Sequence, residues 1–480
     1  MATYDRRSPT RISFRSSINR CSRHGAAVGR KNLEAAATIS TRVNARAASK
    51  AVRKYLAAYA EDSAQSGAHL AQRFAQVVVI PAYGEDEVLD RAIASIPNPE
   101  HGSALAVVVI NAREDSPAAV KAINQATSTR LRARYCEHRW LNDDTLLCQA
   151  PFGALALIHV TLPRGQGVGL ARKHGADLAL GAWAAGLIDS SWIHCTDADV
   201  QLPNDYFCTP HQSATVALHR FRHETTELAT RAHARTYDLW LRLHVLGLHW
   251  AGSPYGFHTI GSTITVDAHS YAVVRGFPRR NAAEDFYFLN KLAKIGTVIT
   301  AASAPLRIAA RISDRVPFGT GAAIGLAQRE GSGALPRFYH PSTYLYLRTT
   351  LNALQASSAT GHFERHSLQQ SLRQQGLDPA PADAAMDALG FTAAVDKLLH
   401  ASTVPQQRRR ALHCWFDAFR TMKFIHHVRD NGVASVDARS ALAAGQFLLG
   451  QQQPEVADDI RVVRGVLANA ASIIEPRSTC

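Results

Sequence analysis

The 480-residue chain lacks the features of a membrane-spanning or secreted protein. It contains no uncharged apolar run of about 18 residues, the length at which a membrane-spanning helix is predicted. Its basic N-terminus has no apolar segment of the kind that a secretory signal peptide carries. We therefore expect a cytoplasmic protein that makes at most peripheral contact with a membrane.

The chain also lacks several motifs that would identify its chemistry. Its seven cysteines are scattered and include no Cys-x-x-Cys pair, which argues against a disulfide framework and a zinc site. No P-loop signature, no His-Glu-x-x-His and no Gly-x-Ser-x-Gly occurs. The sequence thus offers no support for a P-loop nucleotidase, a zinc peptidase or a serine hydrolase.

Negative charge is scarce only at the N-terminal end. The formal net charge is +14, yet residues 1–60 hold 13 Lys and Arg against Asp5 and Glu34, so about +11 of it lies there. The body of the chain has little excess charge, and we expect no nucleic-acid partner. Residues 1–45, rich in Arg, Ser and Ala, are predicted to be a disordered basic tail.

Strands and helices are predicted to alternate through the first two thirds of the chain. Continuous β-branched runs, typical of strands buried on both faces, are followed by segments with helical spacing of apolar residues. The predicted strands are 74–80, 104–110, 155–162 and 191–196, and the predicted helices between them are 86–96, 117–126 and 169–184. This order indicates an α/β fold with a mostly parallel, Rossmann-like central sheet.

From about residue 340 onward the pattern is helical throughout. We predict three parts: a basic leader at 1–73 with one helix near its end, an α/β domain at 74–335, and an all-helical region at 336–480.

A buried strand ending at two carboxylates is the most informative stretch. Trp192–Cys195 is followed by Thr196, Asp197, Ala198 and Asp199. Carboxylates so close repel each other unless a cation or a proton separates them. Because ligands bind at the carboxyl ends of strands in α/β sheets, a metal–phosphate site is the functional hypothesis. A solvated polar turn is the alternative.

Two further motifs are ambiguous by themselves. The glycines of 165–169 do not form a dinucleotide fingerprint, because the third small residue would be Leu170 or Arg172. They predict a tight turn that opens a helix, from which Arg172 could face an anion. Glu284 and Asp285 open another helix, where acids either complement the helix dipole or supply a general base.

Taken in order, these motifs resemble those of the family 2 glycosyltransferases of the GT-A fold. The resemblance covers residues 75–315 and rests on five motifs: Pro81–Glu85, Asn111–Ser116, Gly165–Gly175, Thr196–Asp199 with Pro203, and Gly276–Phe277 followed by Glu284 and Asp285. It implies transfer of a sugar from a nucleotide-diphosphate sugar to an acceptor hydroxyl on a small molecule, a glycan or a lipid-linked compound.

The resemblance implies a role for each matching residue. Asp199 and Asp197 would bind Mg²⁺ or Mn²⁺, and Asp285, beside Glu284, would be the catalytic base of an inverting reaction. The residues expected to bind the nucleotide sugar are Ala82, Tyr83, Glu85, Asn111, Arg172, Asp197, Ala198, Arg311 and Arg315.

The chain departs from the family at two points. Asn111 stands where the family usually has an Asp that contacts the base, and residues 307–320 lack the His that some relatives use as a third metal ligand. Ser313 or Asp314 could replace it, or Arg311 and Arg315 could bind the diphosphate directly.

Other functions remain open at this point. The same fold could support a retaining transferase or a sugar-phosphate nucleotidyltransferase. A non-catalytic nucleotide-sugar-binding protein is the alternative outside enzymes.

Overall fold

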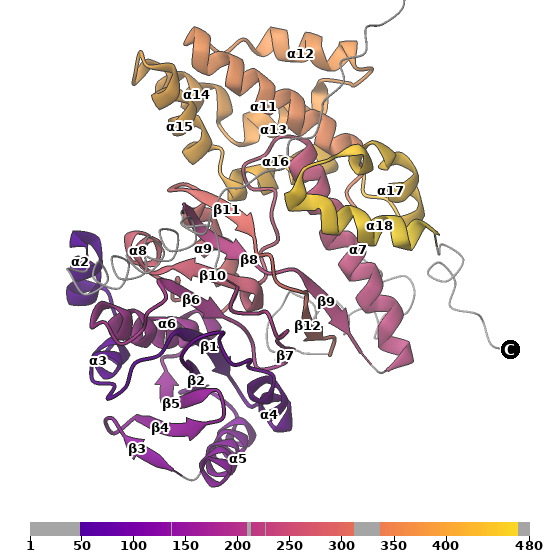
Figure 1. Ribbon diagram of the computed structural model, residues 1–480. Helices are drawn as coiled ribbons and strands as arrows, with labels where there is room; N and C mark the ends of the chain where they lie inside the picture. The colour runs from indigo at the N-terminus through magenta and orange to yellow at the C-terminus, as the bar shows by residue number, and fades with distance from the viewer. Residues whose placement is uncertain (1–48, 136, 209–212, 226, 312–336, 469–480) are drawn as a thin grey trace, which may run out of the picture. The chain divides into compact units, whose positions relative to one another are not determined.

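A nine-stranded sheet organises the first part of the chain (Figure 1). The computed structural model describes residues 49–468 except 136, 209–212, 226 and 312–336. In spatial order the strands are β11 (Thr297–Thr300), β8 (Ala214–Leu218), β10 (Ile264–Asp267), β6 (Trp192–Cys195), β1 (Gln76–Ala82), β2 (Ala104–Arg113), β5 (Gly153–Leu162), β4 (Thr145–Ala150) and β3 (His138–Trp140). The predicted α/β class is confirmed.

The sheet is mixed, so the prediction of a mostly parallel sheet holds only at its centre. Strands β6, β1, β2 and β5 are parallel neighbours, as are β8 and β11. Strand β10 runs antiparallel to both β6 and β8. Strand β4 runs antiparallel to both β3 and β5, because the short turns that join these strands allow only antiparallel pairing.

Both faces of the sheet are covered by helices, which explains the continuous apolar runs. Val77 and Val79 of β1 pack in the same cluster as α6, whereas Val78 and Ile80 point to the other face, toward α4 and α5. The covering helices are α2 (Lys50–Ala58), α3 (Ser63–Ala68), α4 (Glu87–Ala94), α5 (Ala118–Arg134), α6 (Val168–Ala184), α8 (Ala268–Val273) and α9 (Glu284–Leu292).

Helices α2 and α3 belong to this packed body. Val52 and Tyr55 of α2 are fully buried in the cluster that contains α6, and the Tyr55 hydroxyl donates to Asp177 Oδ1 at 2.6 Å. The residues predicted to be a disordered tail lie outside the described part of the chain. The domain boundary at 73/74 stays a prediction, and the one at 335/336 also falls outside the described residues.

A second core is helical. It is formed by helices from the last part of the chain together with α7 (Leu228–Trp250), which comes from the middle of the sequence. The described helices after residue 340 are α11 (Ser342–Thr360), α12 (Arg365–Gln374), α13 (Ala380–Ala388), α14 (Phe391–His400), α15 (Pro405–Trp415), α16 (Ala418–Asp430), α17 (Ala438–Ala444) and α18 (Ala457–Ala468), with short 3₁₀ turns at Gln446–Gly450 and Pro454–Val456. Figure 1 shows these helices gathered around one end of α7. None of the described helices has the length and apolarity needed to cross a membrane.

A small three-stranded sheet lies beside the main one. It joins β7 (Val200–Gln201), β12 (Leu306–Ala309) and β9 (Phe221–Glu224), and the sequence patterns did not predict β7 or β12. The Asp197–Asp199 turn lies between β6 of the main sheet and β7 of the small one, so the two sheets together fix both ends of the segment that carries the two carboxylates.

Candidate active site

The predicted site residues gather where the strand order reverses. The chain passes from β1 to β2 and β5 on one side, and then returns to place β6 on the other side of β1. Ligand-binding crevices form outside the carboxyl ends of strands at such a switch point. Ala82 ends β1, Asn111 lies near the end of β2, and the 196–199 turn follows β6.

Arg172 is the buried centre of the site. Its side chain is 1% exposed and donates to Asp197 Oδ1 at 2.6 Å and to the Glu284 carboxylate. Gly261 makes room for it, because a β-carbon there would lie 2.8 Å from a guanidinium nitrogen. The helix residue that was expected to face an anion therefore joins the two acidic segments directly.

The glycines before α6 explain how these segments meet. A β-carbon on Gly169 would lie 2.4 Å from the Pro278 carbonyl oxygen, and one on Gly167 would lie 2.5 Å from Asn281 Oδ1. The loop before α9 can therefore lie directly against the start of α6, where Gly169 N–H donates to the Arg280 carbonyl at 3.2 Å. The glycines before α6 therefore allow the close approach of two backbone segments, in addition to forming the turn.

Arg311 joins a second pair of carboxylates. Its Nε donates to Asp199 Oδ2 at 2.9 Å and its Nη2 to Glu85 Oε1 at 2.8 Å. Ala198, between the two aspartates, is buried, and the Ala309 N–H donates to the Asp199 carbonyl at 3.0 Å. Glu85 and Asp199 therefore lie on either side of one guanidinium, although 114 residues separate them along the chain.

The site holds more negative than positive charge. Arg172 and Arg311 form ion pairs with four acidic residues, and a fifth lies nearby. The four are Glu85, Asp197, Asp199 and Glu284, and the fifth is Asp285. If all are ionised, the formal charge is three units negative, and burying such an excess is costly unless protons or a cation offset it.

The pKa values express this cost. Burial raises the pKa of Asp199 to about 6 although Arg311 opposes the change, and the charges of Asp197 and Glu85 act in the same direction as burial. Burial also raises the pKa of Glu284 against the effect of Arg172. The pKa of Asp285 rises to about 7, again mainly through burial and then through the charge of Glu284.

Glu284 and Asp285 differ in what they contact. Glu284 is 4% exposed and is held by Arg172, whereas Asp285 is partly accessible and accepts a hydrogen bond from the Phe286 N–H at 2.7 Å. Ala283, immediately before them, has φ of +59°, a left-handed conformation that costs a non-glycine residue free energy. This conformation sets the direction in which α9 begins, and with it the position of both acids.

Amide side chains hold the loop that follows β1, around Pro81–Glu85. Asn111 is buried, and its Nδ2 donates to the Ala82 carbonyl at 2.8 Å and to the Val109 carbonyl at 3.2 Å. An aspartate could make neither bond, so the Asn at this position has a structural use. Asn124 holds the same loop by accepting a hydrogen bond from the Gly84 N–H at 2.9 Å. The Tyr83 hydroxyl lies 3.0 Å from Ser116 Oγ.

The oxygen donors suit a hard divalent cation. Asp199, Asp197 and Glu85 supply carboxylate oxygens, which Mg²⁺ and Mn²⁺ prefer, and the surplus of negative charge favours such an ion. In the structure each of these carboxylates already has a guanidinium partner. Among the described residues, no group of three or more His, Cys, Asp or Glu side chains is arranged to hold a metal ion.

Three of the residues expected at the site are not described, and two contacts at the site were not expected. Arg315, Ser313 and Asp314 fall outside the described part of the chain. The contacts of Gly261 and Asn124 were missed by sequence reasoning, because neither residue carries a motif and only the fold brings each to the site.

Comparisons with known proteins give a distant likeness to solved structures and no match elsewhere. No protein-family model matches the chain, and no curated protein does. Among solved structures the chain is similar to a mannosyltransferase from Pyrobaculum calidifontis in complex with GDP-Man and Mn²⁺, with 13% sequence identity, coverage of 94% of this chain and 98% of that chain, and a TM-score of 0.30. A likeness at this TM-score assigns neither family nor function, so the functional argument rests on the site itself.

Proposed function

We propose that the chain is a glycosyltransferase of the GT-A type, which moves a sugar from a nucleotide-diphosphate sugar to an acceptor hydroxyl with inversion. The observation that carries the proposal is the excess of carboxylates, buried at Glu85 and Glu284 and partly exposed at Asp197, at the switch point of the sheet. A site of this kind requires a cation when its carboxylates are ionised, and a diphosphate donor brings one with it.

Different residues would bind the metal ion, the diphosphate and the nucleotide. Asp199 and Asp197 would hold Mg²⁺ or Mn²⁺, and this ion would stabilise the charge that develops on the leaving diphosphate. Arg311 would exchange its carboxylate partners for phosphate oxygens, which a guanidinium binds in the same geometry. Ala82, Tyr83 and Asn111 would line the site of the nucleotide.

Asp285 would be the general base. It is the partly accessible member of the acidic pair, and its raised pKa of about 7 suits a group that takes a proton near neutral pH. Glu284, held by Arg172, would position α9 and keep the pKa of its neighbour raised.

A donor screen tests the proposal. Thermal shift and transfer are measured with UDP-, GDP-, ADP- and dTDP-sugars, with and without Mn²⁺, for wild type and Asp285→Asn. We expect one donor to stabilise both proteins in the presence of metal, and only the wild type to transfer, with a loss of at least about a hundredfold in the variant.

Asp437→Asn is the matched control, because asparagine also caps a helix and Asp437 caps α17 in the helical region, away from the site. Equal activity of Asp285→Asn and wild type would contradict the assignment of the base. A product with retained anomeric configuration would indicate a retaining transferase, and release of pyrophosphate a nucleotidyltransferase. Donor binding without turnover in the wild type would indicate a binding protein.

A further inference from the structure

A cavity of about 360 Å³, partly open to solvent, lies between the edge of the sheet and the helical region. Strand β11 and the end of β8 form one wall, helix α7 forms another, and Asp458 and Asp459 of α18 close it. Ala293 and Gly296, which line it, follow the C-terminal end of α9, and Asp285 is at the other end of that helix, about 12 Å away along the axis. The cavity is therefore separate from the carboxylate site.

The lining of this cavity contains an unusual number of unsatisfied nitrogen atoms. Five buried side-chain nitrogens without a hydrogen-bond partner among the described residues belong to it: Arg220 Nε, Arg242 Nε, His249 Nδ1, His258 Nδ1 and His413 Nε2. The side chain of Arg242 is 1% exposed, so its Nε has no access to bulk solvent. Buried donors of this kind normally have a partner, which points to a ligand.

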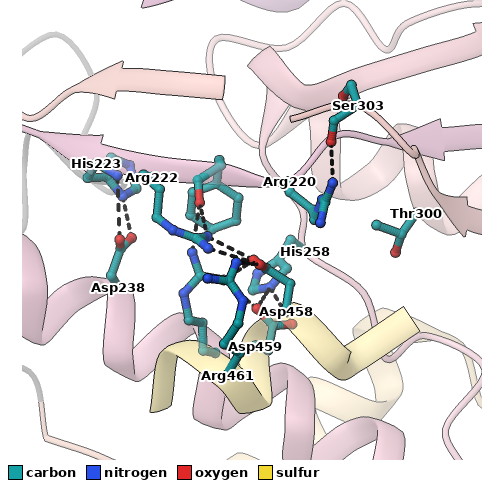
Figure 2. Close-up of polar contacts among 12 residues, drawn as sticks. Arg220, Arg222, His223, Asp238, His258, Thr300, Ser303, Asp458, Asp459 and Arg461 are labelled. Carbon is teal, nitrogen blue, oxygen red and sulfur yellow. Dashed lines mark hydrogen bonds and ion pairs between the residues drawn. The ribbon is translucent and has the colours of Figure 1, made fainter. Parts of the chain in front are cut away.

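The two aspartates of the cavity already have partners, and the third acid of its lining, Glu455, is exposed. Asp458 accepts from Arg222 at 2.8 and 2.9 Å and also binds Arg461 (Figure 2). Asp459 binds Arg242 and lies 3.1 Å from His258 Nε2. Donors are thus left over while these carboxylate acceptors are engaged, and a guanidinium can only donate. The missing partner must supply acceptor oxygens.

His258 adds a second requirement. Its Nε2 faces two carboxylate oxygens of Asp459, which can only accept, so this nitrogen carries the hydrogen. In the neutral ring Nδ1 then has a lone pair and accepts a hydrogen bond. The complementary ligand therefore offers anionic oxygens to the arginines and a hydroxyl to the imidazole.

We propose that this cavity binds a small organic anion that carries hydroxyl groups, such as a hydroxy acid or a polyol phosphate. Its volume is that of a small-molecule site, and Phe221 and Phe257 supply apolar surface for a carbon skeleton. Arg220 would hold the anion while keeping its bond to the Ser303 carbonyl at 2.5 Å. The proposal is independent of sugar transfer.

Calorimetric binding to the full chain tests it, with glycerol 3-phosphate and gluconate as probes of the phosphate and carboxylate classes and glycerol as the uncharged control. We expect one of the two anions to bind and glycerol not to bind. Arg220→Gln should weaken binding about tenfold or more, because it removes a charge-assisted hydrogen bond. His249→Phe, which keeps a ring but supplies no nitrogen, should weaken it too.

Two controls locate the binding. Arg348→Gln replaces an arginine that packs on Trp250 outside the cavity lining, and Arg311→Gln removes a cation of the carboxylate site. Neither should change the affinity for the anion. Failure of both anions to bind the wild type, or equal affinity in wild type, Arg220→Gln and His249→Phe, would overturn the proposal. Loss of binding in Arg311→Gln alone would overturn it as well.

Discussion

Asp285 should set the pH dependence of the reaction. Burial and then the charge of Glu284 together raise the pKa of its carboxyl to about 7, against the effect of Arg172. A general base acts in its ionised form, so kcat/KM should be constant above pH 7 and should fall about tenfold for each pH unit below it. The measurement is a pH profile of kcat/KM with saturating metal.

Glu284→Gln provides the check on this assignment. The substitution removes the negative neighbour and leaves Arg172 to act on Asp285 alone, so the midpoint of the profile should move to lower pH. A midpoint that stays in place or moves to higher pH would show that another group controls the profile.

Arg311 should compete with a metal ion for the same oxygens. Its guanidinium contacts Asp199 and Glu85, so Arg311→Gln frees two carboxylates and removes one positive charge from the site. At such short range one charge is worth several kcal/mol, and we expect Mn²⁺ to bind at least about tenfold more tightly in the absence of donor. Calorimetry of Mn²⁺ binding measures this effect.

Arg113→Gln is the matched control for that experiment. Arg113 packs on Tyr83, in the loop that follows β1, and forms its ion pair with Asp115. Its Mn²⁺ affinity should equal that of the wild type. Weaker Mn²⁺ binding in Arg311→Gln would show that the arginine does not compete with the ion.

At the scale of elements, the contact between α6 and the loop before α9 controls the site. Gly169→Ala would place a β-carbon 2.4 Å from the Pro278 carbonyl oxygen, so the loop must move away from the helix. We expect unfolding free energy to fall by about 1–3 kcal/mol through overpacking. Because Arg172 and Glu284 lie on either side of this contact, kcat/KM should fall by at least about tenfold.

Gly450→Ala serves as the control, because nothing lies within 4 Å of a β-carbon there. Chemical denaturation and steady-state kinetics on both variants give the two quantities. If Gly169→Ala matched Gly450→Ala in both, the close approach would have no bearing on the site.

The sequence could predict the strands and helices better than the contacts between them. The apolar run before Asp197 and Asp199 indicates a strand, and the carboxyl end of a strand is a known place for a ligand. The pairs Arg172–Glu284 and Glu85–Arg311 are 112 and 226 residues apart, and no local pattern encodes them. Strand β12 has only four residues and depends on pairing with β7 and β9, so its own sequence gives a weak signal.

At the scale of the whole described body, helix α7 links the two cores. Leu239, Leu243 and Leu246 pack in the helical core, while Arg242 on the same helix is buried against Asp459 of α18 and donates to the Phe221 carbonyl at 2.8 Å. The last described helix is thereby attached to β9, a strand of the small sheet. This attachment consists of ion pairs at a buried position, where loss of one partner is costly.

Asp459→Asn should therefore destabilise the protein strongly. The substitution leaves the Arg242 guanidinium, 1% exposed, with the longer 3.6 Å contact to Asp458 as its remaining ion pair, and it removes the charge that faces His258. We expect a loss of about 3 kcal/mol in unfolding free energy, the lower end of the range for breaking a buried pair. Asp189→Asn breaks the exposed pair with Arg73 and should cost no more than about 1 kcal/mol. Urea denaturation of the two variants measures the difference, and equal losses would mean that the buried pair of Asp459 with Arg242 contributes no more to stability than the exposed pair of Asp189 with Arg73.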